Sequence, residues 1–172
     1  MLRRMMDHIY RLAEFLAAAC VFAIFALILT QVSLGLVDRI FAVAGASALG
    51  LAIPSYAEIA AYLLVAATFL GLSSTLVHEV HVRVTLFLGH APEAVARAMN
   101  VACGLIGFGV SAFFLWRCTV LVHESWSFGD TSYGQVAIPL WMPQSTMVVG
   151  LAFLTLAFVD FTWRTLAAAE ED

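Results

Sequence analysis

Three residues in the middle of the chain have side chains that can bind a metal ion. His78, Glu79 and His81 resemble the zinc-peptidase motif, in which two histidines lie four residues apart on one helix face and a glutamate follows the first. Here the second histidine comes only three residues after the first, and a third ligand is lacking unless His90 folds back. The spacing therefore favours a histidine pair at the end of a membrane helix over a metal site.

The positions of the histidines also argue against a bound haem. A helical bundle holds haem iron with imidazole groups that project from facing helices into the interior. All five histidines lie outside the long uncharged runs of the sequence, at positions 8, 78, 81, 90 and 123. We therefore expect no cofactor. A membrane anchor of a quinone- or haem-linked redox complex is kept as the alternative function.

A serine in the third uncharged run resembles half of a nucleophile elbow. Gly109 and Ser111 have the right spacing, but Phe113 stands where the closing glycine belongs. No histidine lies near enough in the run to activate the serine hydroxyl. We therefore predict that the chain is not an enzyme and that it has no catalytic residue.

The composition is typical of a membrane protein. Of 172 residues, 63% are hydrophobic and 12% are charged, whereas about a quarter of the residues in soluble domains are charged. All eight basic residues are arginine, and they are scattered along the chain. This scatter excludes the clustered basic surface that binds nucleic acid.

Four uncharged runs predict an all-α membrane protein that forms a single membrane domain over residues 1–172. A helix needs about 20 residues to cross the hydrocarbon core of a bilayer. Pro54 interrupts the stretch between the first two runs, which favours an external loop over a fifth span. Four transmembrane helices are expected over residues 15–37, 58–78, 97–121 and 140–160. Interfacial segments are expected over residues 1–13 and 82–90, the second as a short helix between the second and third spans.

The arginines predict the orientation of these spans. Arg39 and Arg117 fall on one side of the membrane, and the other six arginines fall on the side that also holds both termini. Because arginine is enriched in cytoplasmic segments, we expect the N-terminus and the C-terminus to be cytoplasmic.

Small residues recur every four positions in two of the predicted spans. Such a pattern makes a shallow groove in which another helix can approach closely. The spacing leaves open whether a helix of this chain or of a partner fills each groove. The residues are Ala67, Gly71 and Thr75 in the second span, and Cys103, Gly107 and Ser111 in the third.

Two stretches of the sequence resemble one known family. Residues 81–87 read HVRVTLF and follow Gly71 by ten residues, and Ser132 precedes an Ile-Pro-Leu-Trp run over 138–141. Both are similar to patterns in the small permease subunit of tripartite ATP-independent periplasmic (TRAP) transporters, the DctQ type. Glu58, at the start of the second span, fits a third pattern of this family. Thr85 stands where the family usually has an aspartate.

The resemblance implies a small, non-enzymatic subunit of a bacterial inner-membrane transporter. Its implied partners are a large permease subunit of the DctM type, a periplasmic substrate-binding protein of the DctP type, and membrane lipids. The implied activity is sodium-driven uptake of an organic acid that carries a carboxylate, for which this chain scaffolds the large subunit. The candidate family-motif and partner-interface residues are Glu58, Gly71, His81, Arg83, Gly107, Ser111, Ser132, Pro139 and Trp141.

The charge pattern within the spans agrees with a supporting role. A subunit that moves a substrate with a coupled ion usually keeps an ionisable group at mid-membrane depth. None of the four uncharged runs contains a carboxylate, a histidine or a basic residue. A self-associating four-span structural protein is a third hypothesis.

Overall fold

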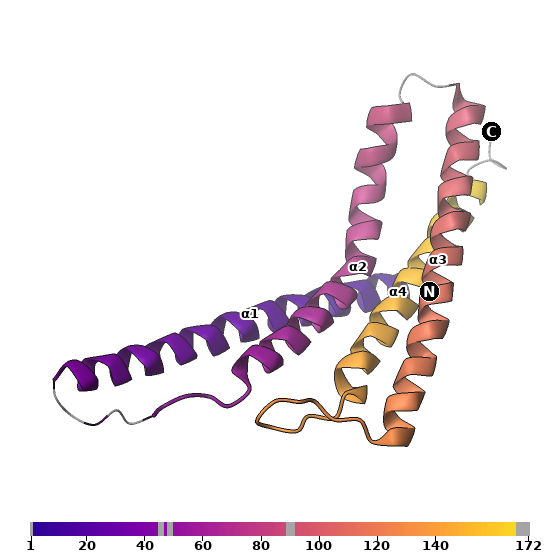
Figure 1. Cartoon of the computed structure of the whole chain (residues 1–172). Coiled ribbons are helices and arrows are strands. Elements are labelled where there is room, and N and C mark those ends of the chain that lie inside the picture. Colours follow the sequence, from indigo (N-terminus) through magenta and orange to yellow (C-terminus); the bar gives the residue numbers. More distant parts are fainter. Residues whose placement is uncertain (1, 45–46, 48–49, 89–91, 168–172) are drawn as a thin grey trace.

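The computed structural model describes residues 2–44, 47, 50–88 and 92–167, with side chains described from residue 8 onward except at 73–75, 77–88, 93 and 94. The described chain forms four helices, shown in Figure 1. They are α1 (Leu2–Val43), α2 (Tyr56–Leu88), α3 (Glu93–Phe128) and α4 (Trp141–Ala167). The prediction of an all-helical protein is confirmed for this part of the chain.

Three of the helices are long and apolar enough to cross a membrane. These segments are His8–Val43, Val95–Phe128 and Trp141–Ala167, and the apolar part of α2 whose side chains are described, Tyr56–Leu72, is shorter. At 1.5 Å per residue the 42 residues of α1 extend about 63 Å, roughly twice the thickness of the hydrocarbon core. In a bilayer α1 must therefore tilt strongly or project into the headgroups and water.

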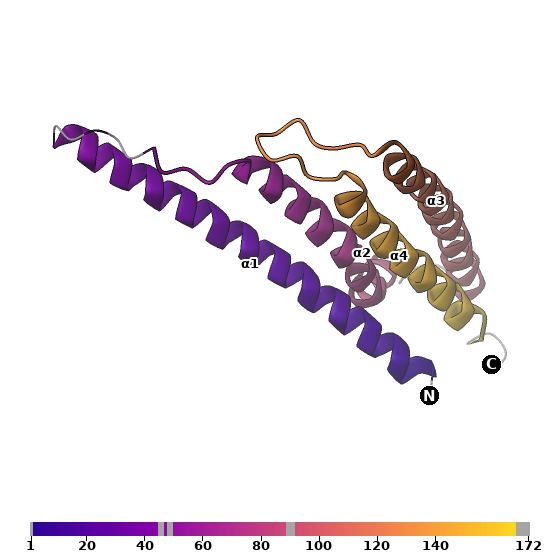
Figure 2. The same cartoon turned by 90° about the horizontal axis from the view of Figure 1, so that it is seen from below.

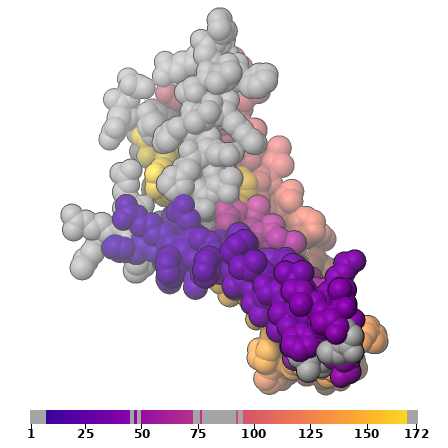
Figure 3. All heavy atoms as spheres, turned by 90° about the vertical axis from the view of Figure 1, so that its left-hand side faces the viewer, coloured from indigo at the N-terminus to yellow at the C-terminus, as the bar shows by residue number. Residues whose placement is uncertain are grey.

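The helices form an open row in the order α1, α2, α4, α3. α2 contacts α1 on one side and α4 on the other, and α4 in turn contacts α3. Figure 2 shows the four helices side by side in this order, and Figure 3 shows α1 lying across the surface of the molecule. α1 and α3 are therefore the two edges of the row, and each has a long face directed away from the other helices.

α1 packs on α2 through side chains whose spacing alternates between three and four residues. This is the spacing of coiled-coil helices, which keeps one narrow seam turned toward a partner. Tyr10 and Ala13 are buried at the start of the seam, which continues along most of the helix. Its buried and half-buried members are Tyr10, Ala13, Ala17, Cys20, Ile24, Leu27, Gln31, Leu34 and Asp38.

α4 packs on both of its neighbours through glycines. A Cβ on Gly107 of α3 would overlap with the ring of Phe158, and a Cβ on Gly150 of α4 would overlap with the backbone of Phe69 in α2. The absence of side chains at these positions lets the helices approach closely. Tight contacts therefore fix α4 between α2 and α3.

The helices extend beyond the predicted spans. Residues 82–88 belong to the continuous helix α2 and residues 2–13 to the continuous helix α1, and the interfacial position of both segments stays a prediction. The residues described between 44 and 55 are not helical, as expected from Pro54. α3 begins directly after Pro92 and ends at Phe128. The next residue, Gly129, caps the helix with a φ of 66°, in the left-handed region that glycine adopts readily.

Candidate functional site

Four of the nine candidate residues lie at one end of the molecule, around the loop of residues 129–140 that connects α3 to α4. This loop is closed by backbone hydrogen bonds, in which the N–H of Ser132 donates to Ile138 (2.8 Å) and the N–H of Leu140 donates to Asp130 (3.0 Å). Thr131 and Pro139 form an isolated antiparallel bridge between these bonds. The loop is thus a narrow hairpin, visible at the bottom of Figure 1.

The hydroxyl of Ser132 fixes the tip of this hairpin. Its Oγ donates to the carbonyl of Val136 (3.1 Å) and accepts from the N–H of Ile138 (3.1 Å). The side chain is buried, with 8% of its surface exposed. Because both backbone groups find a partner in one hydroxyl, the loop keeps its shape without a regular strand pair.

The tip of the hairpin contacts the start of α2. The N–H of Val136 donates to Oγ of Ser55 across 81 residues of sequence, at 3.0 Å. The hydroxyl of Tyr62 donates to Oε1 of Glu58 at 3.0 Å. A Cβ on Gly134 would overlap with Oε2 of Glu58 and lie 2.7 Å from Oγ of Ser55. We call Ser55, Glu58, Tyr62, Ser132 and Gly134 the loop junction.

Glu58 is only partly hydrogen-bonded in this arrangement. Its Oε2 is buried and accepts no hydrogen bond from the described residues, and the same is true of Oε1 of Gln144 in the first turn of α4. Buried acceptors without a partner destabilise a fold and are rare in native proteins.

Polar side chains of α1 hold the segment that leads into the junction. Oε1 of Gln31 accepts a hydrogen bond from the N–H of Ile53 (2.8 Å), and Oδ2 of Asp38 accepts one from the N–H of Leu51 (3.0 Å). Both donors lie shortly before Ser55. The C-terminal end of α1 and the start of α2 are therefore connected to the hairpin between α3 and α4.

Pro139 and Trp141 complete this end of the molecule. The carbonyl of Pro139 accepts from the N–H of Met142 in the first turn of α4 (3.2 Å). Trp141 packs edge-to-face against Trp126 of α3, with ring centroids 4.8 Å apart. Such aromatic pairs add attraction beyond the area that they bury, so this pair stabilises the contact between α3 and α4 beside the loop.

The remaining described candidates lie in contacts between or within helices of this chain. Gly71 faces Ala17 of α1, with 4.0 Å between a Cβ on the glycine and the alanine Cβ. Gly107 faces α4, and Ser111 is buried, with its hydroxyl bonded to the carbonyl of Phe108 in its own helix (3.1 Å). Neighbouring helices of the same chain thus lie against both groove glycines, whereas Cys103 in the same row as Gly107 is exposed. The side chains of His81 and Arg83 lie outside the described residues.

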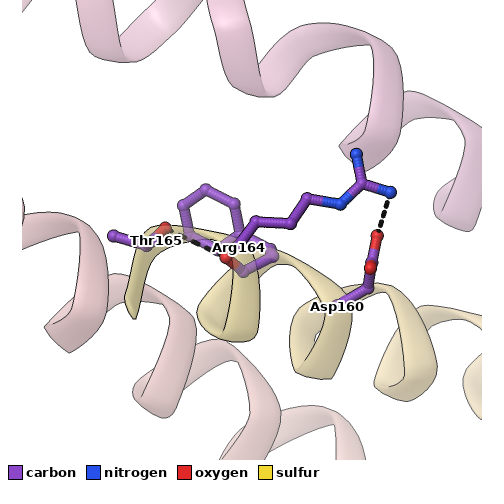
Figure 4. A network of polar contacts seen from close by, with 4 residues as sticks. Asp160, Arg164 and Thr165 are labelled. Carbon is purple, nitrogen blue, oxygen red and sulfur yellow. Dashed lines mark hydrogen bonds and ion pairs between the residues drawn. The ribbon is translucent and has the colours of Figure 1, made fainter. Parts of the chain in front are cut away.

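An ion pair marks the opposite end of α4. Arg164 and Asp160 are 2.5 Å apart and one helical turn from each other, and the hydroxyl of Thr165 donates to the carbonyl of Phe161 (Figure 4). The Arg164 side chain is 44% exposed, so water and headgroups screen the pair, which stabilises the helix by at most about 1 kcal/mol. Its position at the end of the apolar part of α4 fits a membrane interface.

The chemistry of the loop junction is that of a structural contact. One carboxylate, three hydroxyl groups and several backbone groups hold two loops together. Within the described residues, no group of three or more histidine, cysteine, aspartate or glutamate side chains is arranged to hold a metal ion. The junction connects the hairpin between α3 and α4 to the start of α2.

The fold and this junction define a helical membrane protein whose polar contacts join its loops and helix ends. The chain belongs to the DctQ component family of tripartite ATP-independent periplasmic transporters, which matches residues 40–168. The matched range contains the last residues of α1 and the whole of α2, α3 and α4. The family expected from the sequence motifs is confirmed, and the chain is a small subunit of a TRAP transporter. No curated protein matches the chain.

Sequence reasoning missed three members of the loop junction, namely Ser55, Tyr62 and Gly134. One local signal was available, because Glu58 and Tyr62 are four residues apart and therefore neighbours on one helix face. Nothing in the sequence connects Ser55 to residues 134–136, since that contact depends on how α2 and α4 pack. Gly104 and Gly150, which also lie in tight helix contacts, were not among the candidates either.

Proposed function

We propose that this chain scaffolds the large permease subunit of a TRAP transporter in the bacterial inner membrane. A periplasmic binding protein delivers an organic acid with a carboxylate group to the transporter, and a sodium gradient drives its uptake. The observation that carries this proposal is the family match over residues 40–168, which makes the chain a DctQ component of a TRAP transporter.

The open row of helices supports a scaffolding role. A closed bundle directs most of its apolar side chains inward, whereas this row leaves the long outer faces of α1 and α3 available to lipid or to another subunit. Helices associate in a membrane through close packing and a few polar contacts, because lipid is as apolar as the side chains. An edge helix can therefore extend the row into a larger subunit.

The charges support the same role. In each span the charged residues lie toward the ends, as Glu14 and Asp38 do in α1. Ion-coupled carriers place ionisable groups at mid-depth, where they bind the ion or substrate. We infer that ion coupling and substrate binding belong to the other components.

The proposal is tested by expressing this chain with a permease of the DctM type and a binding protein of the DctP type from the same organism. We expect the permease to copurify with the chain, and sodium-dependent uptake of the organic acid to require all three proteins. Transport that continues unchanged without this chain would contradict the scaffolding role. A stoichiometric haem absorbance in the purified chain would favour the redox-anchor alternative.

The motif in α2 gives a second test of assembly. We propose that His81 and Arg83 contribute to docking of the permease on the cytoplasmic side. Arg83→Ala and His81→Ala should each reduce copurification and uptake. Arg39→Ala removes one arginine from the other end of the molecule and is the control. Wild-type assembly in both motif variants would make the motif a marker of the fold only.

A further inference from the structure

We propose that Glu58 and Gly134 form a clamp that holds the hairpin of residues 129–140 on the start of α2, and that this clamp stays closed during transport. The clamp sets the position of α4 relative to α2 at the loop end of the molecule. The statement that the clamp stays closed during transport rests on the proposed function. The role of the clamp in packing α4 against α2 does not.

The first part of the clamp is the fixed carboxylate of Glu58. The Tyr62 hydroxyl bonds its Oε1 at 3.0 Å, from the next turn of the same helix. This bond directs the other oxygen, Oε2, toward the hairpin, where it is buried without a hydrogen bond from the described residues. The carboxylate therefore acts through its position and shape, as a side chain against which the hairpin rests.

The second part is the absence of a side chain at Gly134. A Cβ at this position would overlap with Glu58 Oε2 and approach Ser55 Oγ. Among the described glycines, left-handed φ values occur at Gly50 and Gly129 and not at Gly134. Gly134 is thus needed for space and not for its backbone conformation, so the hairpin tip fits the start of α2 only without a side chain there.

The clamp acts on α4 because the hairpin leads directly into that helix. The bond between the N–H of Val136 and Ser55 holds one arm of the hairpin, and the bond from the N–H of Leu140 to Asp130 holds the base beside Trp141. Farther along the row, Gly150 of α4 lies against the backbone of Phe69 in α2. Two contacts separated along the helices restrain both sliding and rotation of α4 against α2.

A double-mutant cycle on the purified full-length chain in detergent tests the clamp. Gly134→Ala should lower the midpoint of thermal unfolding by roughly 4 °C, because the added methyl group displaces the hairpin from Glu58. Glu58→Ala should also lower it, because it takes away the acceptor of the Tyr62 hydroxyl and leaves a gap beside the hairpin. The double variant should lose clearly less than the sum of the two. Gly109→Ala is the matched control, because nothing lies within 4 Å of a Cβ at that position. Additive effects, or a Gly134→Ala midpoint equal to that of Gly109→Ala, would overturn the clamp.

A reversible cross-link tests whether the clamp stays closed. The chain carries Ser55→Cys and Val136→Cys, and alanine replaces its natural cysteines Cys20, Cys103 and Cys118. This variant is assembled into the complete transporter for the uptake measurement. We expect the same uptake with the disulfide oxidised and after reduction. Uptake that is lost on oxidation and recovered on reduction would show that the clamp must open. If uptake does not depend on this chain at all, the proposed function fails, and the unfolding cycle still decides the clamp.

Discussion

At the scale of single residues, one hydroxyl group adds two hydrogen bonds to the hairpin between α3 and α4. Ser132 satisfies both a backbone N–H and a backbone C=O of the same loop while it is buried. Ser132→Ala leaves these two groups without their partner, which should lower the free energy of unfolding by about 1–2 kcal/mol. Equilibrium unfolding in detergent measures this change. Ser127→Ala is the control, because that hydroxyl bonds a carbonyl of its own helix (2.8 Å), and an equal loss in both variants would contradict the prediction.

Two glycines of α3, two residues apart, are predicted to respond in opposite ways to alanine. A methyl group at Gly107 would overlap with the ring of Phe158, so Gly107→Ala should destabilise the chain by about 1–3 kcal/mol. A methyl group at Gly109 meets open space, and Gly109→Ala should be neutral or stabilise by up to about 1 kcal/mol, because alanine favours the helix. The midpoints of thermal unfolding distinguish the two variants.

A second substitution separates steric overlap from a general effect of alanine. Phe158→Ala removes the ring that Gly107 faces, and the added cost of Gly107→Ala should then largely disappear. An undiminished cost in the Phe158→Ala chain would show that the glycine is needed for another reason.

The residues of the loop junction show how far single positions can be predicted from sequence. Glu58 and Ser132 were found because they fit a family pattern, and both lie in the junction. Ser55 and Gly134 were missed because their contact joins positions about 80 residues apart. Such a contact follows from the packing of α2 beside α4, which no local pattern encodes.

At the scale of elements, uncharged runs predicted where helices lie but not where they end. Residues 2–13 and 82–88 carry charges and therefore fell outside the predicted spans, yet the helical backbone continues through both. A charged side chain is no obstacle to helical backbone, whereas proline and left-handed glycine are stop signals, as at Pro92 and Gly129.

The seam of α1 was also difficult to recognise in the sequence. In a soluble protein, polar residues on the opposite face would reveal such a stripe. Here the face directed away from α2 is as apolar as the seam and exposes large side chains such as Phe22 and Val32. In the first half of α1 the two faces differ in size, with Ala13 and Ala17 inside and phenylalanines outside.

Cross-linking tests the register of α1 against α2. A Cβ on Gly71 would lie 4.0 Å from that of Ala17, within the range that a disulfide spans. Ala17→Cys with Gly71→Cys should therefore form a disulfide under mild oxidation, in a chain without its three natural cysteines. Ala18→Cys with Gly71→Cys should not, because Ala18 is exposed on another face of α1. Equal cross-linking of the two pairs, measured by gel mobility, would mean a different register.

At the scale of the whole molecule, the order of the helices is the feature that sequence predicted least. The chain runs α1, α2, α3, α4, but α4 lies between α2 and α3. This order depends on a glycine in each contact of α4. Gly150 of α4 faces Phe69 of α2, and Phe158 of α4 faces Gly107 of α3. Residue patterns were enough to predict four helices and the family. The open row could not be predicted from them, because it depends on how the helices pack.

Arginine distribution predicts the orientation of this row in the membrane. The end that holds the loop junction has Arg39 and Arg117, and the other six arginines lie toward the end that holds both termini. Because arginine-rich segments are retained in the cytoplasm during insertion, the loop junction should face the periplasm. The Arg117 guanidinium lies 5.9 Å from the ring centre of Trp116, a pairing that suits the membrane–water interface.

Cysteine labelling of intact cells tests this orientation. Tyr133, at the tip of the hairpin, is fully exposed, and His8, near the other end of the row, is also exposed. In a chain without natural cysteines, Tyr133→Cys should react with a membrane-impermeant maleimide added outside the inner membrane. His8→Cys should react only after the membrane is permeabilised. The reverse pattern would place the loop junction in the cytoplasm, where it could not face a periplasmic binding protein, and the arrangement proposed for the transporter would then be wrong.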